Sequence, residues 1–225
     1  MAKKDQEKQV DVGEVYSKSE AFIETNKRPI TIAVLAIVVI FGAYVGYKKL
    51  YVQPQEAEAQ ELIWKAEYFL EIDSLDKAII GDGGNFGFEY IADEYSGTES
   101  GNLANYYLGA IYMKKQDYAL AIEYFKNSTA GGIVPNAQTL GNIGDAYVEL
   151  EDIDQAISYF EKAANASGDD YTTPMYLIKA GIAYESMGEY AKAADAYRRI
   201  TVDHPNCDQI LDVKKYLGRA ENMPG

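Results

Sequence analysis

Few residues of this chain have types and spacings that could support chemistry. His204 and Cys207 lie three residues apart in DHPNC, and they are the only histidine and the only cysteine among the 225 residues. A zinc site or an acid–base catalyst needs further ligands or partners, and a single cysteine cannot form an internal disulfide. We therefore interpret both as loop residues and expect no catalytic residue and no metal ligand here.

The glycine-rich run GDGGN, residues 81–85, is a second candidate. A phosphate-binding loop needs a lysine followed by serine or threonine, and a calcium loop needs several carboxylates, whereas this run offers only Asp82. We interpret the run as an excursion between two helices. The sequence thus predicts a protein that is not an enzyme and has no cofactor, metal ion or small-molecule substrate.

Charge separates the first 50 residues from the rest. Residues 1–50 carry 8 Lys and Arg against 6 Asp and Glu, and residues 51–225 carry 13 against 29. An acidic body repels phosphate backbones, so we expect no nucleic-acid partner. A solvated surface is the simplest interpretation of the acidity, and a dedicated basic partner is the alternative.

An uncharged run of 18 residues, 30–47, stands between basic pairs at 27–28 and 48–49. At about 1.5 Å per residue, a helix of this length nearly spans a hydrocarbon core of about 30 Å. A buried soluble helix would carry more polar residues, and a cleaved signal peptide would lie closer to the N-terminus. We therefore predict a transmembrane helix over residues 29–48, after a tail of residues 1–28.

The orientation of this helix rests on its flanking charges. Three Lys and Arg lie within about 20 residues of each end, which gives no preference. Lys3, Lys4 and Lys8 add to the N-terminal side, and long C-terminal domains cross a membrane largely regardless of charge. We expect a cytoplasmic N-terminus and a body outside the cytoplasm.

Three stretches of the body align with one another. Each has a glycine, then a tyrosine three residues later, an alanine nine residues after that and an aromatic residue four residues further on. The aligned sets are Gly109, Tyr112, Ala121 and Phe125; Gly144, Tyr147, Ala156 and Phe160; and Gly181, Tyr184, Ala193 and Tyr197. Small residues let two antiparallel helices approach closely, and the aromatic rings fill the space between neighbouring hairpins.

This pattern resembles the tetratricopeptide repeat, whose period is about 34 residues, and Pro205 corresponds to its closing proline. The resemblance implies an all-α fold, a superhelix of antiparallel helical hairpins preceded by the one transmembrane helix. We expect the repeat domain at 55–222, with a divergent first repeat at 55–98, repeats at 102–134, 137–170 and 174–205, and a capping helix at 207–222.

The divergent first repeat carries the weakest form of the pattern. A helix is expected from residue 55 to residue 70, with Trp64, Ala66 and Phe69 on one face. Ala78 corresponds to the repeat alanine. Tyr90 precedes Phe125 by one period, so we expect it at the aromatic position.

The resemblance also implies a binding surface. In family members the first helix of each hairpin lines a concave groove, and positions 2, 5, 9 and 12 face inward when the glycine is position 8. These positions hold Leu103, Tyr106, Ala110 and Met113; Gln138, Gly141, Asp145 and Val148; and Met175, Ile178, Ile182 and Glu185. We expect a mixed, largely apolar surface suited to peptide segments; the alternative is that these residues only pack against the capping helix.

Relatives that bind the C-terminal carboxylate of heat-shock chaperones use a lysine and an asparagine at positions 5 and 9 of this groove. Here those positions hold Tyr106 and Ala110, then Gly141 and Asp145. That clamp is therefore absent from the sequence.

The order of a tail, one anchor and an acidic repeat body is similar to the bacterial inner-membrane proteins that serve as ancillary subunits of the Sec translocon. The resemblance implies a periplasmic repeat domain, and as partners the translocation channel and a membrane-anchored peptidyl-prolyl isomerase chaperone. We expect an adaptor that holds emerging secreted proteins. The alternative is a scaffold that assembles an envelope complex for division, outer-membrane assembly or secretion without binding clients.

Overall fold

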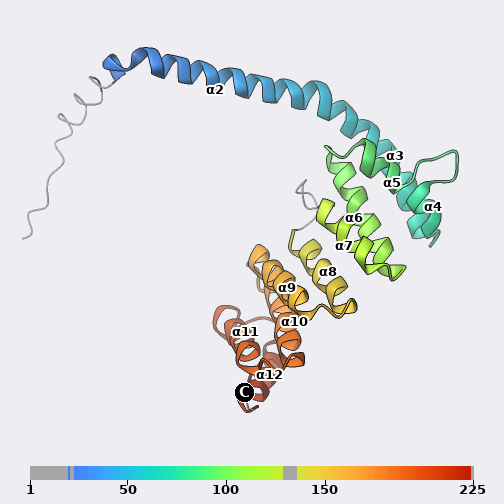
Figure 1. Cartoon of the computed structure of the whole chain (residues 1–225), viewed down its shortest axis with the longest axis vertical. Coiled ribbons are helices and arrows are strands. Elements are labelled where there is room, and N and C mark those ends of the chain that lie inside the picture. The colour runs from blue at the N-terminus through green and yellow to red at the C-terminus, as the bar shows by residue number, and fades with distance from the viewer. Residues whose placement is uncertain (1–19, 21–22, 129–135, 224–225) are drawn as a thin grey trace, which may run out of the picture. The chain divides into compact units, whose positions relative to one another are not determined.

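The structure is a computed structural model that describes residues 20, 23–128 and 136–223. It divides into two units, Met1–Gln53 and Pro54–Gly225. Every regular element in the described ranges is a helix, and one isolated bridge joins Gly81 to Phe86 (Figure 1). The expected all-α fold is confirmed.

The first unit contains the apolar helix α2 (Lys27–Tyr47), followed by one π-helical segment, η1 (Lys48–Val52). None of the residues of α2 is buried. An 18-residue window here has a mean hydropathy of 2.4, which together with its length would allow the helix to cross a membrane. Most of the expected tail, residues 1–19 and 21–22, lies outside the described residues.

The second unit is a series of helices that follow one another as hairpins (Figure 1). Its helices are α3 (Gln53–Glu71), α4 (Leu75–Ile80), α5 (Phe88–Glu94), α6 (Glu99–Lys114), α7 (Tyr118–Ser128), α8 (Asn136–Glu149), α9 (Ile153–Ser167), α10 (Thr172–Ser186), α11 (Tyr190–Asp203) and α12 (Ile210–Glu221). The three regular hairpins are α6 with α7, α8 with α9, and α10 with α11. The end of the repeat expected at 102–134 lies outside the described residues from position 129 onward.

The repeat glycines allow the two helices of each hairpin to approach closely. A Cβ atom added at Gly109 would lie 2.6 Å from Cδ1 of Phe125, and one at Gly144 would lie 2.6 Å from Cδ1 of Phe160. In the third hairpin a Cβ at Gly181 would lie 2.4 Å from the ring of Tyr197. Each glycine therefore leaves the space that the aromatic ring of the same hairpin fills.

Each hairpin turns through one residue in the left-handed region. Asp73, Gln116, Glu151 and Gly188 occupy these turns, with φ between 58° and 76°. The following helix then begins within two residues; at α9 the carboxylate of Asp152 accepts a hydrogen bond from the N–H of Gln155 (3.2 Å). The turns within the hairpins thus share one backbone conformation.

Two expectations for the divergent first repeat are wrong. Phe88, which is fully buried, holds the aromatic position, whereas Tyr90 is 38% exposed and stacks on Phe86. Phe88 precedes Phe125 by 37 residues, the interval that also separates Phe160 from Tyr197, so the 35-residue interval that pointed to Tyr90 is two residues short. On α3, Ala66 and Phe69 are buried but Trp64 is 59% exposed, so Trp64 does not share their face.

The last helix, α12, packs through the residues expected of a capping helix. Val213 and Ala220 are buried, and Ile210 and Leu217 pack against the same cluster at their edges. Leu211, on the outward side, is 71% exposed. The helix therefore covers the end of the described hairpins with one apolar side.

Candidate protein-binding surface

The twelve expected groove positions lie on α6, α8 and α10, the first helices of the three regular hairpins. Gln138, Val148 and Ile182 are exposed, and Ile182 is 49% exposed. Gly141 is buried, and a Cβ there would overlap the ring of Tyr176 at 2.0 Å. Gly141 is therefore a packing position, and the remaining eight residues are half-buried.

Polar contacts cross from each first helix to the next. Gln138 Nε2 donates to Tyr106 Oη (2.8 Å), which joins α8 to α6. Lys179 Nζ lies 2.7 Å from both carboxylate oxygens of Asp145, which joins α10 to α8.

Beyond α10 the same kind of contact continues to the last helix. Arg219 Nη2 donates to Glu185 Oε2 at 2.5 Å, which joins α12 to α10. Together with the two contacts above, it forms a polar ladder along this face, running from Tyr106 to Arg219.

The apolar side chains at the expected positions are divided between solvent and the core. Leu103, Met113, Met175 and Ile178 turn part of their surface into the apolar clusters between helices. The ring of Tyr106 packs 5.7 Å from that of Phe125. The outer surface is therefore shared between the polar ladder and exposed apolar side chains such as Val148 and Ile182.

Sequence reasoning missed Lys179 and Arg219, which supply the cations of this ladder. Lys179 Nζ also lies 5.5 Å from the ring centroid of Phe160 and 5.9 Å from that of Tyr176. Burial, with the Asp145 carboxylate adding to it, raises the pKa of Tyr176 to about 12. The available signal was spacing, because each cation follows its acidic partner by 34 residues, one repeat.

The residues that were first considered as catalytic or metal-binding candidates make contacts within the fold. His204 Nδ1 lies 2.6 Å from Asp170 Oδ1, and His204 and Cys207 are both buried in the loop after α11. Asp82 Oδ1 accepts hydrogen bonds from the backbone N–H groups of Gly84 and Asn85 within its own loop. No group of three or more His, Cys, Asp or Glu that could hold a metal ion occurs among the described residues.

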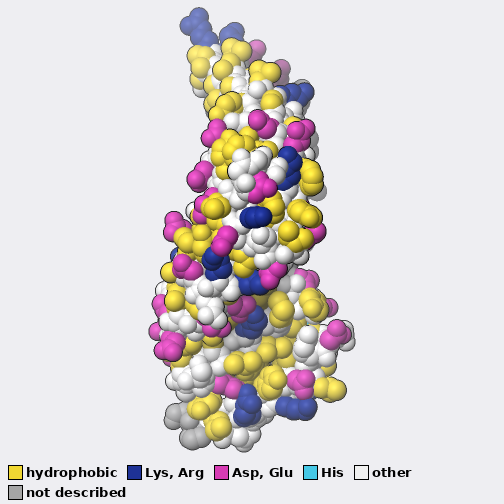
Figure 2. Space-filling model, turned by 90° about the vertical axis from the view of Figure 1, so that its right-hand side faces the viewer, with side chains coloured by type: hydrophobic (Ala, Val, Ile, Leu, Met, Phe, Trp, Pro, Cys, Tyr) yellow, Lys and Arg dark blue, Asp and Glu magenta, His cyan; other side chains and the backbone are white. Residues whose placement is uncertain are grey.

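Charged side chains of both signs are spread over the surface. Figure 2 shows Asp and Glu side chains alternating with Lys and Arg, and hydrophobic side chains gathered in small groups between them. Such a surface can recognise a polypeptide through several small contacts.

Comparisons with known proteins agree with the repeat architecture. Tetratricopeptide-repeat profiles match residues 104–129 and residues 135–201. No curated protein sequence matches the chain. The crystal structure of MamA protein aligns with a TM-score of 0.55 at 19% identity, over 74% of this chain and 80% of its own. A Podosopora anserina protein of nearly identical TPR-like repeats aligns with a TM-score of 0.53 at 13% identity, over 73% and 85%.

Residues 104–129 and 135–201 thus consist of tetratricopeptide repeats, as the spacing of the glycines and aromatic residues predicted. Domains of this kind act as protein-interaction adaptors, which places the function of this chain in the class of protein–protein interaction. The solved structures share less than 25% identity with this chain, so their likeness concerns the fold.

Proposed function

We propose that this protein is a membrane-anchored adaptor that binds a partner protein along the face of α6, α8 and α10. The observation that supports it most directly is the polar ladder, in which three successive repeats present paired donors, acceptors and charges on one line. The ladder residue Gln138 is exposed, as are Val148 and Ile182 on the same helices. An extended or helical segment of a partner can contact several repeats at once along such a line.

The anchor is part of this proposal. Helix α2 has no buried residue among its 21 positions, and a helix of this length spans about 30 Å. We propose that it holds the repeat domain at a membrane, with the N-terminus in the cytoplasm and the repeat domain in the periplasm of a bacterium. Protease treatment of spheroplasts tests this orientation, and a repeat domain that stays protected contradicts it.

The finer proposal is that the protein is an accessory of the Sec translocon and of envelope chaperones. Its support is the resemblance in architecture to the ancillary translocon subunits: tail, anchor and acidic repeat body. The alternative is a scaffold for an envelope complex. Gentle detergent purification of the tagged full chain from its own membranes separates the two, since the accessory predicts the translocation channel and a chaperone, and the scaffold predicts envelope-assembly proteins without the channel.

The ladder face itself is tested by adding charge where folding does not depend on the side chain. Val148 is 40% exposed and Ile182 is 49% exposed, so Val148→Asp with Ile182→Asp alters the surface and leaves the apolar clusters intact. We expect the co-purified partner to be lost. Val202→Asp is the matched control, because Val202 is 69% exposed on α11 and lies outside the ladder. Equal recovery of the partner with both proteins would refute binding at this face.

A further inference from the structure

The three regular hairpins differ at one position of the second helix. The side chain at this position decides whether the gap to the preceding second helix is filled. In two of them a tyrosine of the second helix stacks on the tyrosine that follows the repeat glycine, with ring centroids 5.4 Å apart. The stacked pairs are Tyr112 with Tyr124 and Tyr147 with Tyr159. The third hairpin keeps Tyr184 but has Ala196 at the position of Tyr124 and Tyr159.

The second tyrosine of each pair reaches back to the second helix of the preceding hairpin. Burial is the main cause that raises the pKa of Tyr124, and Glu89 and Asp93 of α5 lie close enough to raise it further. The ring of Tyr159 lies 5.8 Å from Lys126 Nζ on α7. Each ring therefore fills the gap between two second helices.

Ala196 cannot fill the corresponding gap between α9 and α11. A pocket of about 380 Å³ lies there, lined by residues of α9, α10 and α11. Leu177, Tyr184 and Ala196 form the apolar part of its lining, and the other lining residues are polar or charged: Glu161, Asn165, Lys192, Asp195 and Arg199. None of these residues belongs to the polar ladder or to the expected groove positions.

We propose that this pocket binds an aromatic side chain, tyrosine or phenylalanine, of a partner protein, which stacks on Tyr184 as Tyr124 and Tyr159 stack within the other hairpins. The protein's own repeats supply the template: the same backbone, the same first tyrosine and a ring in the same gap. Offset or tilted stacking of this kind is favourable beyond the area it buries.

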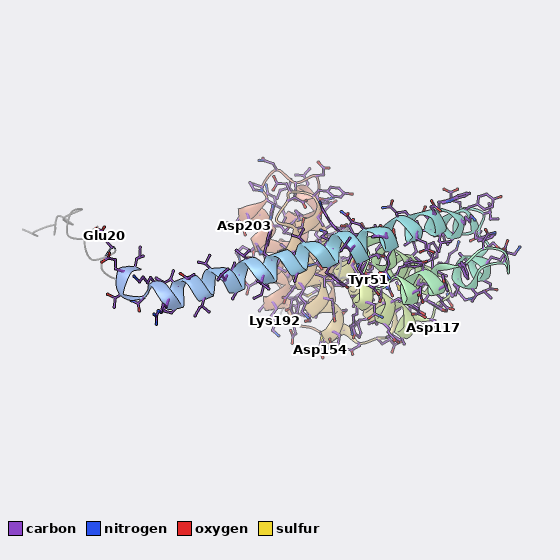
Figure 3. The ribbon with its side chains drawn as sticks, turned by 90° about the horizontal axis from the view of Figure 1, so that it is seen from above. Glu20, Tyr51, Asp117, Asp154, Lys192 and Asp203 are labelled. Atoms are coloured by element: carbon purple, nitrogen blue, oxygen red, sulfur yellow. The ribbon has the colours of Figure 1, made fainter. Side chains whose placement is uncertain are left out.

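The receiving ring is already held in place. Tyr184 Oη donates to Glu161 Oε1 at 2.8 Å, and Lys192 Nζ lies 5.5 Å from the Tyr184 ring centroid. The hydrogen bond that Lys192 Nζ donates to Glu189, with the negative charges of Glu189, Asp154 and Glu161, raises the pKa of Lys192; Figure 3 labels Lys192 and Asp154 on their helices. A fixed ring beside a cation needs little rearrangement to accept a second ring.

Charge favours a different protein over a second copy as the source of that ring. Residues 51–225 carry 29 Asp and Glu against 13 Lys and Arg, so two such bodies repel each other. A partner with fewer acidic residues meets no such repulsion. The occupant is therefore an aromatic residue of another polypeptide.

The test uses the full chain in lipid nanodiscs and ligand-observed NMR with N-acetyl-L-tyrosinamide as the probe. We expect saturable binding with a dissociation constant on the order of 1 mM, as suits a ligand of this size, and none for N-acetyl-L-alaninamide. Ala196→Tyr restores the residue of the other two hairpins and should abolish binding of the probe. Ala191→Tyr, on an exposed position of α11, is the matched control and should retain it.

Tyr159→Ala opens the same gap one hairpin earlier and should add a second site for the probe. The proposal is overturned if the probe does not bind, or if Ala196→Tyr binds it as well as the original protein does at an unchanged melting temperature. Sedimentation of both proteins in nanodiscs tests whether a second copy of the chain occupies the pocket. If the original protein forms dimers and Ala196→Tyr does not, a second copy fills the pocket and the proposal is wrong. These outcomes do not depend on the ladder face, because Val148→Asp with Ile182→Asp leaves the pocket unchanged.

Discussion

Arg198 Nη2 lies 2.6 Å from Glu221 Oε1, and this ion pair joins α11 to α12 at the place where each earlier hairpin uses a tyrosine hydroxyl. The partners are 21 or 23 residues apart in all four cases. The three hydroxyl bonds are Tyr112 with Glu89, Tyr147 with Lys126 and Tyr184 with Glu161. Helix α12 therefore continues the register of the first helices, with an acid in place of the tyrosine.

Because an ion pair stands here where the earlier hairpins have a hydroxyl hydrogen bond, the strength of the two contacts should respond differently to salt. Arg198 and Glu221 are 48% and 46% exposed, so we expect a small coupling that weakens in high salt. A double-mutant cycle with Arg198→Ala and Glu221→Ala measures this coupling from thermal unfolding. Tyr184→Phe, which removes a bond to Glu161, is the control and should respond less to salt. A coupling that is unchanged in high salt contradicts the assignment.

Because an aromatic ring lies so close to each repeat glycine, any side chain at that position should destabilise the domain. In Gly144→Ala the new methyl group would lie 2.6 Å from the buried ring of Phe160, which has little room to move. Overpacking of this kind costs about 1–3 kcal/mol, or about 2–4 °C of melting temperature per kcal/mol for a domain of this size. Circular dichroism during heating of the full chain measures the effect.

Gly218 gives the matched control for that substitution. It holds the same position in α12, but a Cβ there would meet no atom within 4 Å. Gly218→Ala should therefore leave the melting temperature unchanged or raise it, since alanine favours a helix over glycine by about 1 kcal/mol. Equal destabilisation by the two substitutions would show that the contact with Phe160 is not the cause.

The period of the repeats could be predicted from sequence because the glycine and the aromatic residue are both fixed by one contact. The same logic failed in the first repeat, where Tyr90 has the right spacing but Phe88 is buried. Phe88 lies 37 residues before Phe125, whereas Phe125 and Phe160 are 35 apart, and no residue in the sequence marks the two additional positions. Counting residues is reliable only where the connecting turns have constant length.

The binding surface was predicted less well than the fold. The predicted positions lie on α6, α8 and α10, but the exposure of each side chain could not be judged from residue type alone. Met175 and Ile178 turn part of their surface to the core, whereas Lys179, which was not considered, faces Asp145 across the gap between two helices. Pairings between repeats depend on the rise and rotation of the superhelix, which the sequence of one repeat does not contain.

The left-handed turn residue predicts a stabilising substitution. Glu151 has φ 59°, a conformation that costs a residue with a Cβ about 1–2 kcal/mol. The equivalent turn of the third hairpin already has Gly188. Glu151→Gly should therefore raise the melting temperature, by less than that full amount because glycine is also freer in the unfolded chain. Gln155→Gly, inside α9, should lower it; a loss of stability from both substitutions would contradict this interpretation.

The carboxylate of Glu56 on α3 caps the beginning of α6. It accepts hydrogen bonds from the backbone N–H groups of Glu99 (2.7 Å) and Ser100 (3.2 Å) and from Ser100 Oγ (2.6 Å). Burial alone would raise the pKa of Glu56, but these bonds, with one from Gln60, hold it below its usual value of 4.5. Because the folded-state pKa is depressed, the stabilisation is present above pH 4.5 and is lost as the pH falls through the folded value.

Glu56→Gln should accordingly destabilise the domain near neutral pH by about 0.5–2 kcal/mol, the usual range for a helix N-terminal cap. The difference from the original protein should shrink as the pH is lowered below 4.5. Chemical denaturation at a series of pH values measures it, with Glu61→Gln on the exposed side of α3 as the control. A difference that does not depend on pH would show that the charge of Glu56 plays no part.

Buried and half-buried tyrosines predict how the domain responds to alkali. Burial, reinforced by nearby carboxylates, raises the pKa of Tyr95, Tyr107, Tyr112 and Tyr184 to about 12, from an ordinary 10. In the unfolded chain these hydroxyls lose their protons near pH 10, so the stability that they contribute is complete below pH 10 and is lost as the pH rises towards 12. Tyrosinate absorbance and circular dichroism followed together should show ordinary tyrosines titrating first, and a later group that titrates only as helicity is lost. Complete titration near pH 10 with the helices intact would contradict the burial of these hydroxyls.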